Sequence, residues 1–168
     1  MECGFNSPVE AARELIRKYN TEAPPIDVVD ICQREGIQIA YVDLTDVEQR
    51  AGKEISGAIR KDGTNYIIFV NGQDIATRTR FTIAHELGHY FLHMKDSPCE
   101  VITSFRMDQS FIETQANKFA AELLMPEDMV RAEHSKMVIP VSDSLAKKFN
   151  VSKKAMRIRL ENLGLLYV

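Results

Sequence analysis

The sequence has few cysteines, no long apolar run and no large excess of charge of either sign. Its three cysteines lie far apart without a C-x-x-C pair, which excludes a disulfide framework and a cysteine zinc site. With 24 acidic and 21 basic residues the formal net charge is −3, so the chain as a whole offers no electrostatic reason to bind nucleic acid or an anionic membrane. No apolar run approaches the roughly 18 residues of a membrane span, and the first residues lack the features of a signal peptide. We therefore expect a cytoplasmic protein without a membrane partner.

What the sequence does contain is an ordinary globular balance, with 45% hydrophobic and 27% charged residues in 168 positions. This length fits one domain, or one domain with a small appendage, and we divide the chain at residues 1–140 and 141–168. The order of elements is helices, then a small antiparallel or mixed sheet, then more helices. That order predicts an α+β fold rather than alternating α/β units.

Hydrophobic periodicity and turn residues set the expected boundaries. A first helix begins at Ser7-Pro8, and Asp27 caps a second, which ends at Gly36. Asp62-Gly63 between two β-rich runs predicts a hairpin. The segments 43–53 and 95–110 are polar and predict loops, and the stretch after Pro126 is expected to be irregular. The remaining expected elements are strands at 36–43, 55–60 and 66–70, and helices at 76–93, 111–124, 144–149 and 152–163.

The helix expected at 76–93 carries an H-E-x-x-H motif, formed by His85, Glu86 and His89. Four residues along an α-helix rise about 6 Å and rotate about 400°, so both imidazoles stand on one face and can reach one zinc ion. Glu86 is displaced from that face, where it is expected to act on a water molecule as general base. The alternative is two histidines satisfied within an amphipathic helix.

A catalytic zinc needs a third protein ligand and an open position. His93 does not fit, because it would lie about 12 Å along the axis from His85; we expect it to pack or to support the ligands from behind. Glu113, on the next expected helix, is a ligand candidate, and Asn117 one turn later is placed to hydrogen-bond a ligand histidine. Pattern alone leaves Glu113 open between a ligand and a solvated acid at a helix start. The weaker carboxylate candidates are Glu100, Asp108 and Glu122.

Residues 80–93 (RFTIAHELGHYFLH) and 113–126 (ETQANKFAAELLMP) resemble the ImmA/IrrE family of zinc metallopeptidases. The resemblance is specific across residues 53–126. It implies a gluzincin-like core, one Zn²⁺ per chain held by His85, His89 and Glu113, and Glu86 as the catalytic base. It also implies an intracellular endopeptidase that cleaves a helix-turn-helix transcriptional repressor of a phage, a mobile element or a stress regulon. Residues 55–60 are the best candidate for a sheet edge that receives the peptide.

The C-terminal segment is locally basic and resembles a helix-turn-helix unit, with Asn150 at the turn and Ser152 as an N-cap. This supports an alternative function, a DNA-binding or protein-binding transcriptional regulator with a zinc site and no proteolytic activity. We favour the interpretation that two packed helices close the domain, because the chain is acidic overall. DNA binding is therefore not the expected function of this segment, and a docking surface for the repressor is a third interpretation.

Overall fold

A computed structural model describes residues 7–44, 57–95, 109–137 and 142–166. Two short helices come first, α1 (Pro8–Lys18) and α2 (Val28–Arg34). Both start as the sequence predicts. The Ser7 side chain accepts a hydrogen bond from the Glu10 amide, and Asp27 accepts from the amides of Val29 and Asp30. These caps satisfy amide groups that a helix start leaves without partners.

Three strands form a mixed sheet in the order β1-β3-β2: β1 (Ile37–Val42), β2 (Gly57–Asp62) and β3 (Asn65–Asn71). β1 is parallel to β3, and β2 is antiparallel to it. The predicted hairpin is confirmed, with Gly63 in the turn at a φ of 61°. A two-residue turn makes Asp62 and Asn65 a hydrogen-bonded pair, and pairing then alternates along the ladder. The amides of Gly57, Ile59 and Lys61 consequently face outward from β2, at one edge of the sheet.

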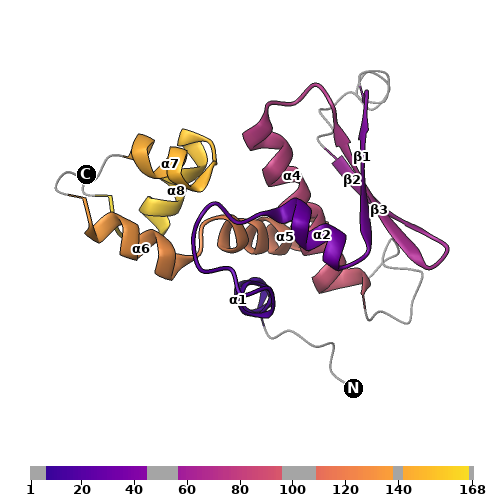
Figure 1. Ribbon diagram of the computed structural model, residues 1–168, viewed down its shortest axis with the longest axis horizontal. Helices are drawn as coiled ribbons and strands as arrows, with labels where there is room; N and C mark the ends of the chain where they lie inside the picture. The colour runs from indigo at the N-terminus through magenta and orange to yellow at the C-terminus, as the bar shows by residue number, and fades with distance from the viewer. Residues whose placement is uncertain (1–6, 45–56, 96–108, 138–141, 167–168) are drawn as a thin grey trace.

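Two long helices lie beside the sheet (Figure 1). These are α4 (Ala76–His89) and α5 (Gln109–Leu124). The helix expected at residues 76–93 is α-helical only as far as His89. The next residues, Tyr90–Met94, form a π-helix, η1. The core gathers between the helices and the sheet; its largest fully buried side chains include Ile68, Ile83, Leu87, Phe119 and Leu123.

The C-terminal part comprises α6 (Glu127–Ser135), α7 (Ser142–Phe149) and α8 (Lys153–Asn162), which lie at the opposite end from the sheet (Figure 1). The prediction of an irregular stretch after Pro126 is wrong for α6. Val130 is the one buried residue of this helix, so the sequence shows no apolar stripe from which the helix could be predicted. Acidic residues in its first turn and His134 in its last favour a helix through the macrodipole.

The α+β class is therefore confirmed, with a mixed sheet. The segments 45–53 and 96–108, predicted as loops, lie outside the described residues, as do Glu100 and Asp108. Among the helices that the structure describes, no one is both long enough and apolar enough to span a membrane.

Candidate metal centre

Within the part of the chain that the structure describes, His85, His89 and Glu113 form one cluster of possible metal ligands. The Nε2 atoms of His85 and His89 are 3.0 Å apart. The Glu113 carboxylate lies with one oxygen 3.1 Å from Nε2 of His85 and the other 3.5 Å from Nε2 of His89. α4 supplies both histidines and α5 supplies the carboxylate, so the cluster joins two helices across an intervening segment of the chain.

These separations fit the edges of a tetrahedral metal site. Zinc–nitrogen and zinc–oxygen bonds of about 2.0–2.1 Å place neighbouring ligand atoms roughly 3.3 Å apart. The donor set, two imidazoles and one carboxylate, is one that catalytic zinc sites use with a fourth position left open. The residues present therefore fit a single zinc ion.

Asn117, on α5, determines which nitrogen of His85 is available. Its side-chain Oδ1 lies 3.0 Å from Nδ1 of His85. Because an amide oxygen can only accept, Nδ1 of His85 carries the proton, and Nε2 is the nitrogen that faces the cluster. Nε2 of His89 and the Glu113 carboxylate face the same point, so a cation bound there would contact all three side chains. The predicted position of Asn117 behind a ligand histidine thus matches the geometry.

Burial also keeps His89 in the form that binds metal. Burial is the largest cause that lowers the pKa of His89 well below its ordinary value, and the neighbouring His85 and His93 lower it further. The Glu113 carboxylate acts in the opposite direction. His89 is neutral at pH 7 as a result. A neutral imidazole offers a lone pair to a metal, whereas a protonated one does not.

Glu86 lies beside the cluster and is nearly buried. Burial, followed by repulsion from Glu113, raises its pKa to about 7, and a hydrogen bond from the backbone of Ile59 works in the opposite direction. A carboxylate with a pKa near 7 is suited to take up and return a proton at neutral pH. The amide of Ile59 is one of those that face outward from β2, so the sheet edge reaches the predicted catalytic base.

Close packing at two glycines brings these elements together. A Cβ on Gly88 would lie 3.1 Å from Cα of Ala116, so the absence of a side chain at Gly88 allows α5 to approach α4 closely. A Cβ on Gly57 would lie 2.4 Å from Cγ2 of Thr82 and 3.7 Å from Oε1 of Glu86. Analysis of the sequence missed the role of Gly57 and Ile59. The phase of the Asp62-Gly63 hairpin was the signal that could have indicated which amides face outward.

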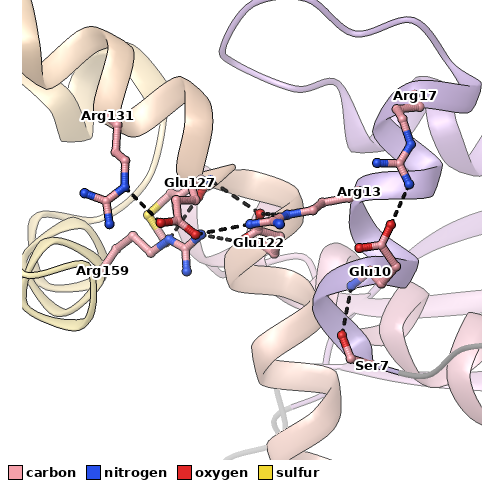
Figure 2. A network of polar contacts seen from close by, with 9 residues as sticks. Ser7, Glu10, Arg13, Arg17, Glu122, Glu127, Arg131 and Arg159 are labelled. Carbon is pink, nitrogen blue, oxygen red and sulfur yellow. Dashed lines mark hydrogen bonds and ion pairs between the residues drawn. The ribbon is translucent and has the colours of Figure 1, made fainter.

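Two other charged residues of α4 and α5 hold elements of the fold together. Arg80 donates to the backbone carbonyls of Ile26 (2.9 Å) and Asn150 (3.2 Å), so it ties α4 to the segment before α2 and to the turn between α7 and α8. Glu122 is not near the cluster but in a network of ion pairs at the junction of three helices. There it accepts from Arg13 of α1 and from Arg159 of α8 (Figure 2). Its partners are the protein's own guanidinium groups, which removes it as a metal ligand.

The fold and the cluster together define a class, an α+β domain with a candidate mononuclear metal site and an adjacent carboxylate. The chain belongs to the family described as the IrrE N-terminal-like domain (Peptidase M78), whose model matches residues 32–161. This confirms the resemblance to the ImmA/IrrE metallopeptidases that residues 80–93 and 113–126 indicated.

Three relatives show how far the similarity extends. The metallopeptidase ImmA of Bacillus subtilis is 29% identical over 154 residues, covering 90% of this chain and 83% of that protein. An uncharacterised immunity region protein 2 of Bacillus phage phi105 is 31% identical over 71% of this chain and 69% of its own. The radiation response metalloprotease IrrE of Deinococcus deserti is 30% identical over 70% of this chain, which corresponds to 40% of IrrE.

Among solved structures, a Mycobacterium tuberculosis transcriptional regulator has the same fold, with a TM-score of 0.62 at 17% identity. The match covers 92% of this chain and 46% of the regulator chain. At this identity the similarity concerns the fold alone.

Proposed function

We propose that this protein is a zinc-dependent endopeptidase in which His85, His89 and Glu113 bind one Zn²⁺ and Glu86 is the catalytic base. The observation that carries the proposal is the convergence of two imidazole nitrogens, 3.0 Å apart, and one carboxylate, whose two oxygens lie 3.1 and 3.5 Å from them, with a nearly buried carboxylate alongside. Membership of a peptidase family supports it. Zinc bound there would polarise a peptide carbonyl and make a water molecule more acidic.

The chain's own residues then account for the proton transfers. Glu86 removes a proton from the attacking water and returns it to the amine that leaves when the peptide bond breaks. Its nearly buried place beside the cluster suits it to both tasks. The core of this site, helices α4 and α5 with the adjoining sheet, corresponds in our proposal to a gluzincin-like peptidase domain within residues 1–140.

The substrate we propose is a helix-turn-helix transcriptional repressor inside the cell. The repressor class follows from the family resemblance, and the name of the phage relative assigns that protein to an immunity region. The decisive experiment incubates the zinc-loaded protein with such a repressor, encoded beside its gene. Parallel samples contain Glu86→Gln, which removes the base but none of the ligands.

We expect the wild-type protein to cleave the repressor and Glu86→Gln to be slower by about 10²–10⁴-fold with unchanged zinc content. Mass spectrometry of the products and metal analysis provide the two measurements. Equal cleavage by both proteins would contradict the role of Glu86. Cleavage by neither would favour the alternative, a regulator that binds its partner without proteolysis.

We further propose that an extended segment of the substrate pairs with the edge of β2 that faces away from β3. Register makes Lys61 a clean test position, because its amide faces outward and takes no part in the ladder with β3. Lys61→Pro should lower kcat/KM and leave zinc content unchanged. Arg60→Pro is the contrasting control, since it removes an amide that pairs with β3 and should destabilise the fold. Unchanged kcat/KM in Lys61→Pro would rule out this mode of binding.

The C-terminal residues 141–168 form, in our proposal, a helix-turn-helix-like unit that packs on the peptidase domain. Asn150 takes a φ of 51° between α7 and α8, the left-handed conformation that a tight turn requires. Four of its basic side chains are paired with acids in the structure, which weakens the DNA-binding alternative. The pairs are Lys148–Glu133, Lys153–Asp143, Arg157–Glu161 and Arg159–Glu122.

A further inference from the structure

Gly57 is the first residue of β2, and it lies against both α4 and β3 with no room for a side chain. A Cβ at this position would be 2.4 Å from Cγ2 of Thr82 on α4 and 2.7 Å from the carbonyl oxygen of Phe69 on β3. Carbon atoms that are not bonded to one another pack best at about 3.5–4.0 Å, so a methyl group here would have to move roughly 1 Å away from α4.

The groups that surround Gly57 belong to parts of the molecule that are held by the core. Thr82 is buried and lies within α4, one helical turn before Glu86. Val70, which pairs with Gly57 across the ladder, is fully buried. The strand β2 has β3 on one side only, because the strand order is β1-β3-β2. The displacement that a side chain at position 57 demands would therefore be taken up by β2.

Glu86 makes this spacing relevant to the proposed chemistry. Its Oε1 would lie 3.7 Å from the same Cβ, so the start of β2 lies beside the proposed catalytic base. The three proposed zinc ligands are on α4 and α5, and the close approach of those two helices depends on a different glycine, Gly88. The distance from β2 to Glu86 can therefore change while the metal site stays as it is.

We propose that Gly57 is a positioning residue, which sets the distance between the substrate-binding edge of β2 and Glu86. This inference rests on the proposed function, because it assigns a task only if a substrate pairs with that edge and is cleaved at the metal. Gly57 is two positions from Ile59 along β2, so its amide and carbonyl face outward in the same phase. The part of the edge nearest to the base is thus formed by the residue whose missing side chain permits the approach.

A substrate strand that pairs with β2 moves together with it. In Gly57→Ala the substrate keeps its backbone hydrogen bonds to the edge, but its scissile carbonyl is displaced from Glu86 and from the metal. A misplacement of about 1 Å costs on the order of 10²-fold in rate, because reacting atoms must be held within narrow limits. The variant should accordingly lose turnover and retain binding.

The test uses the fluorescently labelled repressor encoded beside the gene as the substrate. It measures kcat and KM, the zinc dissociation constant by competition with a chromophoric chelator, and the dissociation constant of the repressor in the Glu86→Gln background. Gly72→Ala is the matched control, because Gly72 follows β3 and its Cβ would have its nearest neighbour at 3.6 Å, an ordinary contact. Thr82→Ser, which removes Cγ2, is made alone and together with Gly57→Ala.

We expect Gly57→Ala to lower kcat about 100-fold, with KM and both dissociation constants within about threefold of wild type. Gly72→Ala should retain the wild-type values. Adding Thr82→Ser to Gly57→Ala should restore part of kcat, because it removes the closest contact and leaves only that with Phe69. A kcat within about twofold of wild type in Gly57→Ala, a loss of zinc affinity or repressor binding, or no recovery in the double variant would overturn the inference.

If Gly57→Ala does not fold, the double variant is compared with Thr82→Ser alone. The remaining contact with the carbonyl of Phe69 should keep its kcat lower by more than about threefold. Equal kcat in these two variants would contradict the positioning role.

Failure of the proposed function gives a different result. If the wild-type protein does not cleave the repressor, or if Glu86→Gln cleaves it equally well, the proposed function is wrong and the inference falls with it. If the wild type cleaves the repressor, Glu86→Gln does not, and Gly57→Ala cleaves it as fast as the wild type, only the positioning role of Gly57 is wrong.

Discussion

Two glutamates on α5, nine positions apart, show two opposite ways of placing a carboxylate. Glu122 is 2% exposed in its side chain and lies between Arg13 and Arg159, so its charge is neutralised by the protein itself (Figure 2). Glu113 is 45% exposed and faces the imidazoles of His85 and His89 in place of a guanidinium group. One carboxylate completes the fold, whereas the other is left with the capacity to bind a cation from outside.

The contrast between Glu122 and Glu113 is tested first by removing each charge and measuring the stability of the metal-free protein. Glu122→Gln leaves Arg159, which is 12% exposed, without its anion and should cost about 3–5 kcal/mol in the free energy of unfolding. Glu113→Gln should change it by less than about 1 kcal/mol, as expected for an exposed group. Urea denaturation of the metal-free proteins gives both values. Similar losses in the two variants would show that the glutamates do not differ in this way.

A second test of the contrast measures zinc binding by the same two variants. Glu113→Gln should lose more than about 100-fold in zinc affinity, since even residues that orient a ligand contribute 10- to 100-fold. Glu122→Gln, if it folds, should bind zinc as the wild type does. Zinc should accordingly raise the melting temperature of the wild type and of Glu122→Gln, with little effect on Glu113→Gln. A zinc-dependent shift in Glu113→Gln equal to that of wild type would exclude Glu113 as a ligand.

Glu35 is a third carboxylate to set beside Glu122 and Glu113. We expect its contribution to the free energy of unfolding to be smaller and to depend on pH. Burial of this side chain, 5% exposed, opposes its ionisation. Hydrogen bonds from Lys18, Lys95 and Tyr19 outweigh burial and lower its pKa to about 2. A lowered pKa stabilises the fold above the unfolded-state pKa of about 4.3, and that stabilisation disappears as the pH falls through about 2.

Wild type should therefore exceed Glu35→Gln in unfolding free energy by at most about 3 kcal/mol at pH 6, and this difference should shrink between pH 4.5 and pH 2. Chemical denaturation across that range measures it. Glu10→Gln serves as the control, because the pair of Glu10 with Arg17 is exposed and should contribute under about 1 kcal/mol. A difference that stays constant down to pH 2 would refute the assignment.

Particular elements show what could be predicted. The caps at Ser7 and Asp27 and the Asp62-Gly63 hairpin follow from local chemistry within a few residues, and the structure has them where the sequence indicated. α6 was missed because its burial depends on neighbours that sequence patterns do not reveal. The π-turn of η1 was missed for a similar reason, since its ring and lysine contacts join it to Phe119 and Glu35.

The sequence by itself determined the spacing of His85, Glu86 and His89, because helical geometry converts a four-residue step into a shared face without help from other elements. It also determined the family to which the chain belongs. Tertiary structure alone decided that Glu113 joins those histidines while Glu122 does not, and that the start of β2 lies beside Glu86. Such choices depend on how closely helices and strands approach one another, and the glycines at 57 and 88 set that distance only once the chain is packed.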